Sequence, residues 1–184
     1  MKITLSGSPG SGKSTLRKML AEHYGLSTKC TGDFMREMSR KHGFSDITKF
    51  LVEYVSKHPE VDNSVDEEQS DFGKLNDNFV LDAHLGFHFV PDSIRICLLC
   101  ELEVASNRIL KDPLRTNEDA RTIIESVLAS KKRMNTMRKN FLNLYNVDIH
   151  DPSNFDLLLD TTNLSSAEVF GEVSAFIDIR VSGI

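Results

Sequence analysis

Apolar and polar positions follow two different periods along this chain, and the two periods alternate. Short runs that are typical of strands occur at residues 2–6, 26–30, 79–81, 94–99 and 155–159, and the last three of these runs are largely apolar. Between these runs, apolar side chains recur three to four positions apart, which predicts helices over 13–24, 31–43, 45–58, 61–75, 101–111 and 165–179, and a long polar-rich helix after residue 115. Strands that alternate with helices favour right-handed crossovers. The pattern therefore predicts a three-layer α/β/α fold with a five-stranded parallel sheet.

The helices between residues 31 and 75 form one block between the second and third predicted strands. Ser45 is the expected N-cap of the middle helix, whose apolar stripe runs from Ile47 to Val55. In a parallel sheet the carboxyl ends of the strands meet at one edge, and ligands bind in the crevice there. We therefore expect that edge to carry the residues that end the strands, namely Ser6, Asp82, Cys100 and Asp160.

Composition supports a single globular domain and limits its partners. Of the 184 residues, 40% are hydrophobic and 27% are charged, which disfavours fibrous and disordered chains. The 22 basic residues are outnumbered by 27 acidic ones, so the formal charge of -5 gives no general attraction for nucleic acid. No apolar run reaches the roughly 18 residues of a membrane span. Three cysteines cannot all pair within one chain, which favours a reducing cytoplasm. We also expect a monomer without membrane or nucleic-acid partners.

Two spacings that resemble metal motifs have simpler interpretations. Cys97 and Cys100 lie within or beside the strand at 94–99, where positions three apart face opposite ways, so we interpret them as core thiols. His84 and His88 are four residues apart, but the Glu of a zinc-protease motif is missing between them. We therefore predict no metal site at either pair.

A glycine-rich loop links the first predicted strand to the first predicted helix. Its residues match the phosphate-binding pattern G-x-x-x-x-G-K-S/T, namely Gly7, Ser8, Pro9, Gly10, Ser11, Gly12, Lys13, Ser14 and Thr15. Glycines let successive amides turn inward toward phosphate oxygens, and the helix start adds its positive end. Lys13 is expected to reach the β and γ phosphates of ATP, and the Ser14 hydroxyl is expected to bind Mg²⁺.

A magnesium ion beside this loop also requires a carboxylate, usually at the end of an apolar strand. Asp82 is our first choice, because the run at 79–81 is the stronger candidate for the strand beside the loop. Asp160, at the end of the last strand, is the alternative. Asp33 offers a further acceptor at the start of its helix, where a capping role is equally consistent with the sequence.

Other segments narrow the class of protein further. The guanine-reading N-K-x-D of GTPases does not occur. The chain instead has G-D-x-x-R-E-M at 32–38, the acidic segment 59–69, D-A-H-L at 82–85 and T-x-N-L-S at 161–165. With the phosphate loop, these segments resemble the archaeal-type cytidylate kinases, within the nucleoside monophosphate kinase family of P-loop kinases. The resemblance covers nearly the whole chain.

That resemblance implies transfer of the γ-phosphoryl group of ATP to a nucleoside monophosphate, foremost CMP or dCMP, by one P-loop kinase domain at 1–184. It also implies a helical acceptor-binding insertion at 33–75 and a short lid at 108–121. The implied catalytic residues are Lys13, Arg36, Arg108 and Arg133, with Arg115, Arg121 and Arg138 as further lid candidates. Thr162 and Asn163 are expected near the adenine. The implied acceptor-binding residues are Asp33, Arg36, Asp66, Gln69 and His84.

The physical chemistry of Arg36 agrees with this role. A guanidinium that forks onto phosphate reduces the repulsion between two anionic reactants and aligns the attacking oxygen. Four residues further along the helix lies Arg40, a like charge, so we predict that Arg36 is not held in an ion pair along its own helix.

The chain also departs from the family pattern, and each departure removes positive charge. His84 stands where relatives usually have arginine, Asp112 stands at a lid arginine position, and Glu67 and Glu68 replace basic residues beside Asp66. A protonated His84 could still contact phosphate, given the ordinary histidine pKa near 6.5. The departures indicate either an acceptor other than CMP or slower catalysis, with Arg115 or Arg121 compensating.

Three other functions remain open at this point. The chain is also compatible with an adenylate-type or other small-metabolite kinase. A nucleotide-binding regulatory module that transfers little would explain the missing basic residues. The stretch from Lys131 to Lys139 also fits an RNA-linked ATPase, although the acidic balance of the chain argues against it.

Overall fold

A computed structural model of the chain describes residues 1–112 and 119–183. Its centre is a five-stranded parallel sheet in the order β2-β3-β1-β4-β5. The strands are β1 (Lys2–Gly7), β2 (Ser27–Cys30), β3 (Phe79–Asp82), β4 (Ile94–Leu99) and β5 (Leu157–Asp160). The predicted parallel sheet and its five strands are confirmed. The last strand begins at Leu157 rather than Phe155, because Phe155 leaves the sheet and packs edge-on against Phe87.

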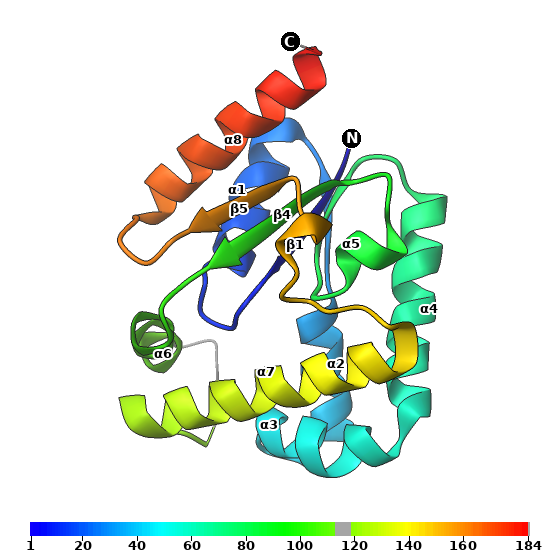
Figure 1. Cartoon of the computed structure of the whole chain (residues 1–184), viewed down its shortest axis with the longest axis vertical. Helices are drawn as coiled ribbons and strands as arrows, with labels where there is room; N and C mark the ends of the chain where they lie inside the picture. The colour runs from blue at the N-terminus through cyan, green and yellow to red at the C-terminus, as the bar shows by residue number, and fades with distance from the viewer. Residues whose placement is uncertain (113–118, 184) are drawn as a thin grey trace.

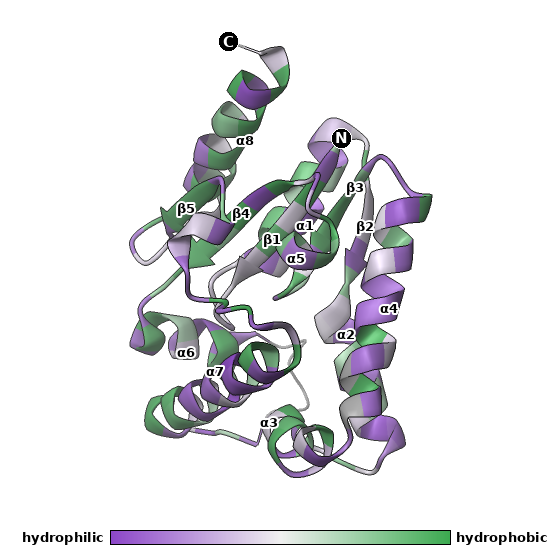
Figure 2. Cartoon of the chain, turned by 45° about the vertical axis from the view of Figure 1, so that its right-hand side comes forward, coloured by the Kyte–Doolittle hydropathy of each residue, from purple (hydrophilic) through white to green (hydrophobic). Residues whose placement is uncertain are grey.

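Helices cover both faces of the sheet, as predicted. The helices α1 (Lys13–Tyr24) and α8 (Ser166–Ser182) pack together on one face, where Leu16, Leu20 and Val173 meet β1, β3 and β4. The short helix α5 (Gly86–Phe89) and the long helix α7 (Ile123–Tyr145) share the other face through Phe87 and Phe141. Figure 2 shows the hydrophobic residues gathered in β3, β4 and β5, between these layers.

Successive side chains of β4 point to opposite faces of the sheet, so neighbouring residues of this strand pack in different layers. Ile96 and Leu98 belong to the core cluster of α1 and α8, whereas Cys97 belongs to the cluster of α5 and α7. Cys97 is thus a core thiol, as predicted. Cys100 lies past the end of the strand and is only partly buried, which corrects its assignment to the core. Both residues are free cysteines.

The predicted helical insertion lies between β2 and β3. It comprises α2 (Thr31–Lys41), α3 (Ile47–Lys49), a π-helical turn at Phe50–Tyr54, a 3₁₀ turn at Val55–Lys57 and α4 (Pro59–Leu75). Asp46, and not the predicted Ser45, caps α3, since its side chain accepts a hydrogen bond from the Lys49 amide at 2.8 Å. Ile47, Phe50, Val55 and Val61 give the insertion a small core of its own.

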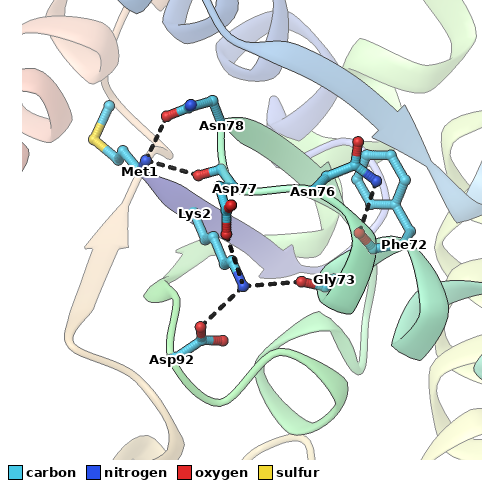
Figure 3. Close-up of polar contacts among 8 residues, drawn as sticks. All are labelled: Met1, Lys2, Phe72, Gly73, Asn76, Asp77, Asn78 and Asp92. Carbon is cyan, nitrogen blue, oxygen red and sulfur yellow. Dashed lines mark hydrogen bonds and ion pairs between the residues drawn. The ribbon is translucent and has the colours of Figure 1, made fainter.

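The far end of the insertion is tied to the first strand (Figure 3). Lys2 Nζ donates to the Gly73 carbonyl of α4 at 2.9 Å and contacts Asp92 Oδ2 at 3.0 Å. The Met1 amino group donates to the Asp77 carbonyl and to Asn78 Oδ1. These contacts fix the return of the chain from α4 into β3.

The carboxyl ends of the strands face a group of helices. Figure 1 shows α2, α3, α7 and α6 (Leu102–Lys111) gathered beyond that edge of the sheet. The pairs Leu5 with Asp82 and Leu99 with Asp160 place the two candidate carboxylates on opposite sides of β1 and β4. Among the described residues, none of the helices is both long enough and apolar enough to cross a membrane.

Candidate active site

The loop between β1 and α1 has a backbone that only glycine can adopt at two of its positions. Gly7 has φ 131°, and a Cβ atom there would lie 2.1 Å from the Leu98 carbonyl oxygen. Gly10 has φ 79°, and its Cβ would lie 2.4 Å from the Ala105 carbonyl oxygen. Contacts this short exclude any side chain. The glycines therefore let the loop pass closely between β4 and α6.

This loop forms a cradle suited to a polyphosphate. The first amides of α1 have no partners within the helix and can donate to an anion. Lys13 Nζ donates to the carbonyls of Gly7 and Ser8, each at 2.9 Å, so its ammonium lies over the loop. Ser8 Oγ and Ser11 Oγ are buried without a hydrogen-bond partner in the described part of the chain. The two unpaired buried hydroxyls, the first amides of α1 and the Lys13 ammonium together fit the phosphates of ATP.

Asp82 lies beside this loop, and Asp160 does not. Ser14 Oγ donates to Asp82 Oδ2 at 3.1 Å, and the Asp82 residue is only 5% exposed. Asp160 instead accepts hydrogen bonds from the Thr162 amide and hydroxyl. The hydroxyl and carboxylate oxygens of Ser14 and Asp82 are of the kind that Mg²⁺ prefers, so this pair could hold the ion.

Cys30 shares the same corner of the site. Its Sγ atom lies 3.7 Å from Asp82 Oδ2. Burial, together with the negative charges of Asp82 and Asp33, raises the pKa of the Cys30 thiol to about 11. The thiol therefore stays protonated at neutral pH and can donate to the Asp82 carboxylate.

Two cavities meet at the phosphate loop. The loop cavity, of about 730 Å³, extends over the start of α1 and is walled by Arg108, Asp112, Thr161 and Leu164. The insertion cavity, of about 130 Å³, lies between the loop, α2, α4 and α7. Both cavities are lined by Lys13, Ser14 and Arg36. The insertion cavity also includes three of the predicted acceptor residues, namely Asp66, Gln69 and His84.

Arg36 is held by a carboxylate of its own helix, contrary to our prediction. Arg36 Nη2 donates to Asp33 Oδ1 at 2.6 Å, three residues back rather than four forward. Asp33 is therefore not a cap, and α2 has no side-chain cap. Burial alone would raise the pKa of Asp33, but the hydrogen bond and charge of Arg36 bring it below its usual value. The pair fixes the guanidinium at the junction of the two cavities.

His84 does not keep the ordinary histidine pKa on which a charged contact with phosphate would depend. Burial, and then the positive charges of Lys13 and Arg133, lower the pKa of His84 well below its usual 6.5. The imidazole is consequently neutral at pH 7. It can exchange neutral hydrogen bonds with a ligand, but it cannot replace the charge of an arginine.

The predicted catalytic arginines occupy different positions. Arg133, on α7, is 7% exposed and lines the insertion cavity. Arg108 Nη2 donates to the Thr161 carbonyl at 2.7 Å and approaches the Leu164 carbonyl at 3.4 Å. Its guanidinium is therefore directed at the segment after β5, whereas we had predicted contact with the transferring phosphoryl group. Arg138 forms an ion pair with Asp148, and Arg121 is exposed.

The predicted lid at 108–121 is described only in part. Residues 113–118, including Arg115, lie outside the described residues. Three other positions lack the positive charge that is usual in the family. Glu68 pairs with Lys29 at 2.8 Å, Glu67 is exposed, and Asp112 lies on the wall of the loop cavity.

The segment after β5 differs from its predicted arrangement. The Thr162 hydroxyl contacts Asp160 and the Glu101 amide, and Asn163 is exposed. Thr161, which we had not singled out, is 1% exposed and contacts the phosphate loop. The T-x-N-L-S segment that begins at Thr161 was the available signal. Tyr145, which donates a hydrogen bond to Asp66, had no comparable signal in the sequence.

A parallel sheet, a phosphate loop at the carboxyl end of its central strand and a carboxylate beside the loop serine are typical of P-loop nucleotide-binding proteins, which include the P-loop kinases, a class of phosphotransferase. Comparisons with known proteins agree with this class. A family model described as an AAA domain matches residues 6–133. A shikimate kinase from Acinetobacter baumannii has the same fold, with a TM-score of 0.62, 17% identity and coverage of 96% of this chain and 92% of that one.

Two archaeal proteins are more similar in sequence. A cytidylate kinase from Pyrococcus horikoshii is 35% identical over 177 residues, which span 96% of this chain and 88% of that protein. A cytidylate kinase from Methanocaldococcus jannaschii is 34% identical in an alignment 184 residues long, which covers 97% of this chain and 98% of that protein. This chain belongs to the archaeal-type cytidylate kinase family of P-loop kinases.

Proposed function

We propose that the protein is a nucleoside monophosphate kinase that uses ATP and Mg²⁺ to phosphorylate CMP or dCMP. The observation that carries the proposal is the junction of two cavities at Lys13, Ser14 and Arg36. Phosphoryl transfer requires two anionic reactants held in line on either side of the transferred group. Two cavities that meet at a lysine and an arginine supply that arrangement.

In this proposal ATP occupies the loop cavity, with its phosphates along the loop and the start of α1. The Lys13 ammonium exchanges the Gly7 and Ser8 carbonyls for phosphate oxygens and offsets their charge. Ser14 and Asp82 would hold Mg²⁺, which when bound would supply positive charge that offsets the charge of the phosphates. This part of the proposal rests on the fit of the loop and of these two oxygen donors.

The acceptor nucleotide occupies the insertion cavity. Arg36, fixed by Asp33, is placed to present its planar fork to the acceptor phosphate. Arg133 supplies a second cation from α7. The apolar side chains of Met35, Ile47 and Val65 on the cavity wall suit a base and a sugar. CMP is the favoured acceptor because the archaeal relatives are named cytidylate kinases.

The chemistry requires positioning more than proton transfer. Phosphoryl transfer proceeds through a loose transition state, so a strong general base has little to contribute. The neutral His84 agrees with this view, since it adds neither charge nor a strong base to the junction. Catalysis then depends on alignment by Arg36 and on charge neutralisation by Lys13, Arg133 and the metal.

A coupled ADP-release assay with CMP, dCMP, UMP and AMP in turn tests this function. We expect turnover that requires an acceptor and is fastest with CMP or dCMP. The Lys13→Ala variant should lose about two to three orders of magnitude in kcat, as does removal of a preorganised charge elsewhere. ATP consumption that ignores every acceptor would overturn the proposal. So would calorimetric titrations in which ATP binds and CMP does not.

A further inference from the structure

Two buried side chains of α4 form a polar pair on the wall of the insertion cavity. Asp66 and Gln69 are three residues apart on the helix, and they are 7% and 3% exposed. Gln69 Nε2 donates to Asp66 Oδ1 at 3.1 Å and to the Val65 carbonyl at 3.3 Å. The other Asp66 oxygen accepts a hydrogen bond from the Tyr145 hydroxyl at the end of α7. Side chains from two helices therefore fix the Asp66 carboxylate.

These contacts determine which way the Gln69 amide faces. The Val65 carbonyl can only accept hydrogen bonds, and an ionised Asp66 can only accept them as well. Rotating the amide by half a turn would bring its oxygen against these two oxygens. The amide nitrogen is therefore held toward Val65 and Asp66, and the amide oxygen is the atom left for another partner.

That oxygen lacks a donor in the described part of the chain. Gln69 Oε1 is buried and has no hydrogen-bond partner among the described residues. A buried acceptor without a partner is uncommon in folded proteins and carries an energetic penalty. An N–H group of a bound ligand would remove the penalty, whereas a ligand oxygen facing the same atom would increase it.

We propose that Gln69, with its amide oriented by Asp66 and Val65, selects an acceptor base that carries an exocyclic amino group. The inference rests on the proposed function, because it takes the insertion cavity as the acceptor site. Cytosine presents an amino group at its C4 position, whereas uracil presents a carbonyl oxygen there. The Gln69 oxygen then accepts from the amino group of CMP and opposes the C4 oxygen of UMP. Gln69 is thus a specificity residue, and Asp66 is the residue that positions it.

The Asp66→Asn variant tests the orienting role most directly. An asparagine side chain can donate as well as accept, so residue 66 no longer forces the amide nitrogen of Gln69 toward it. The measurement is the ratio of kcat/KM for CMP to kcat/KM for UMP. We expect a ratio of about one hundred in the unsubstituted protein, since unpaired polar groups in a site discriminate strongly. In D66N the ratio should fall about tenfold, through both weaker use of CMP and better use of UMP.

Gln69→Met is the second variant. It keeps the approximate size of the side chain and removes the acceptor oxygen. We expect KM for CMP to rise about tenfold and KM for UMP to fall, because the oxygen that opposes the C4 oxygen of uracil is gone. The matched control is Asp71→Asn, the same substitution at an exposed carboxylate of α4 that pairs with Lys74. The CMP to UMP ratio should not change in D71N.

The outcomes separate this inference from the proposed function. If no nucleoside monophosphate is phosphorylated by the unsubstituted protein, the proposed function fails. If CMP is phosphorylated but D66N and Q69M leave the CMP to UMP ratio unchanged, only the Gln69 inference fails. Calorimetric binding of CMP and UMP gives a readout that does not depend on turnover, and ATP binding by each variant shows that it is folded. A loss of CMP and UMP binding in equal proportion by both variants would also contradict a role in selecting the base.

Discussion

The Thr161 hydroxyl at the end of β5 lies 3.0 Å from the Ser11 carbonyl oxygen of the phosphate loop and donates to it. The same hydroxyl lies 3.0 Å from the Leu99 carbonyl and accepts from Arg108 Nη1 at 3.2 Å. Thr161 thus connects α6 and the segment after β5 to the loop that is proposed to bind ATP. Arg108 acts through Thr161, so it is a positioning residue in this arrangement.

Replacing Thr161 by Val should impair ATP binding more than folding. Valine has nearly the same shape but cannot bond to Ser11 or Arg108, so the loop loses a fixed point. We expect KM for ATP to rise about tenfold, with a smaller change in KM for CMP. Thr161→Ser, which keeps the hydroxyl, should restore most of the lost affinity. Equal kinetics in the Val and Ser variants would show that the hydroxyl does not position the loop.

Arg36→Lys should weaken the acceptor side selectively. Lysine keeps the charge but lacks the planar fork that can contact both Asp33 and a phosphate. We expect KM for CMP to rise about tenfold while KM for ATP changes less than about threefold, measured by varying each substrate at saturation of the other. An Asp33→Asn variant should shift KM in the same direction but by less, because Arg36 keeps its charge and loses only its anchor. A larger increase in KM for ATP than in KM for CMP would show that Arg36 contacts ATP rather than the acceptor.

The sequence carried enough information to predict the sheet and the position of Asp82 beside the phosphate loop. Apolar runs mark strands, and a parallel sheet places their carboxyl ends on one edge, so the residue after the run beside the loop had to lie near Ser14. The cap of α3 was harder to predict. Ser45 and Asp46 are both good caps, and Asp46 also accepts a hydrogen bond from the Asp119 amide, which is distant in sequence.

The partners of individual charged groups were the least predictable part of the site. Arg108 binds carbonyls of a segment more than fifty residues away, and no local pattern encodes such a contact. The neutral state of His84 depends on burial and on the approach of Lys13 and Arg133, which come from two other elements. The family resemblance had implied that Gln69 binds the acceptor. The orientation of its amide could not be predicted, because it depends on atoms that only the folded helix brings together.

The depressed pKa of His84 makes a prediction for stability against pH. Above the unfolded pKa of about 6.5 the histidine is neutral in both states and adds no pH dependence. Below that value the unfolded chain binds a proton that the folded protein does not, so stability falls as the pH falls. The slope reaches at most about 1.4 kcal/mol per pH unit for one such group.

Urea unfolding at several pH values between 5 and 8 measures this dependence. His84→Gln should flatten the acid limb of the curve, because glutamine takes up no proton in either state. His88→Gln, a change at an exposed histidine on the same segment, serves as the matched control and should keep the slope of the unsubstituted protein. Equal slopes for H84Q and the unsubstituted protein below pH 6.5 would show that His84 titrates alike in both states.

Asp82→Asn tests the proposed metal site at the end of β3. Asparagine can still accept a hydrogen bond from Ser14, so the fold and the loop should be preserved. It lacks the negative charge, however, and Mg²⁺ binding depends on anionic oxygen. We expect kcat to fall about a hundredfold and half-saturation by Mg²⁺ to move to higher concentration, measured by titrating Mg²⁺ at fixed ATP and CMP.

Two comparisons make this prediction specific. ATP binding measured in the presence of EDTA should be no weaker in D82N than in the unsubstituted protein, because removing a negative charge near the phosphates does not disfavour the free nucleotide. Asp160→Asn makes the same chemical change at the end of β5, where the carboxylate contacts Thr162 instead of Ser14. D160N should therefore keep the Mg²⁺ requirement of the unsubstituted protein. If D160N raised that requirement and D82N did not, the metal would belong at the other strand end, and the junction of the two cavities would have to be reinterpreted without Asp82.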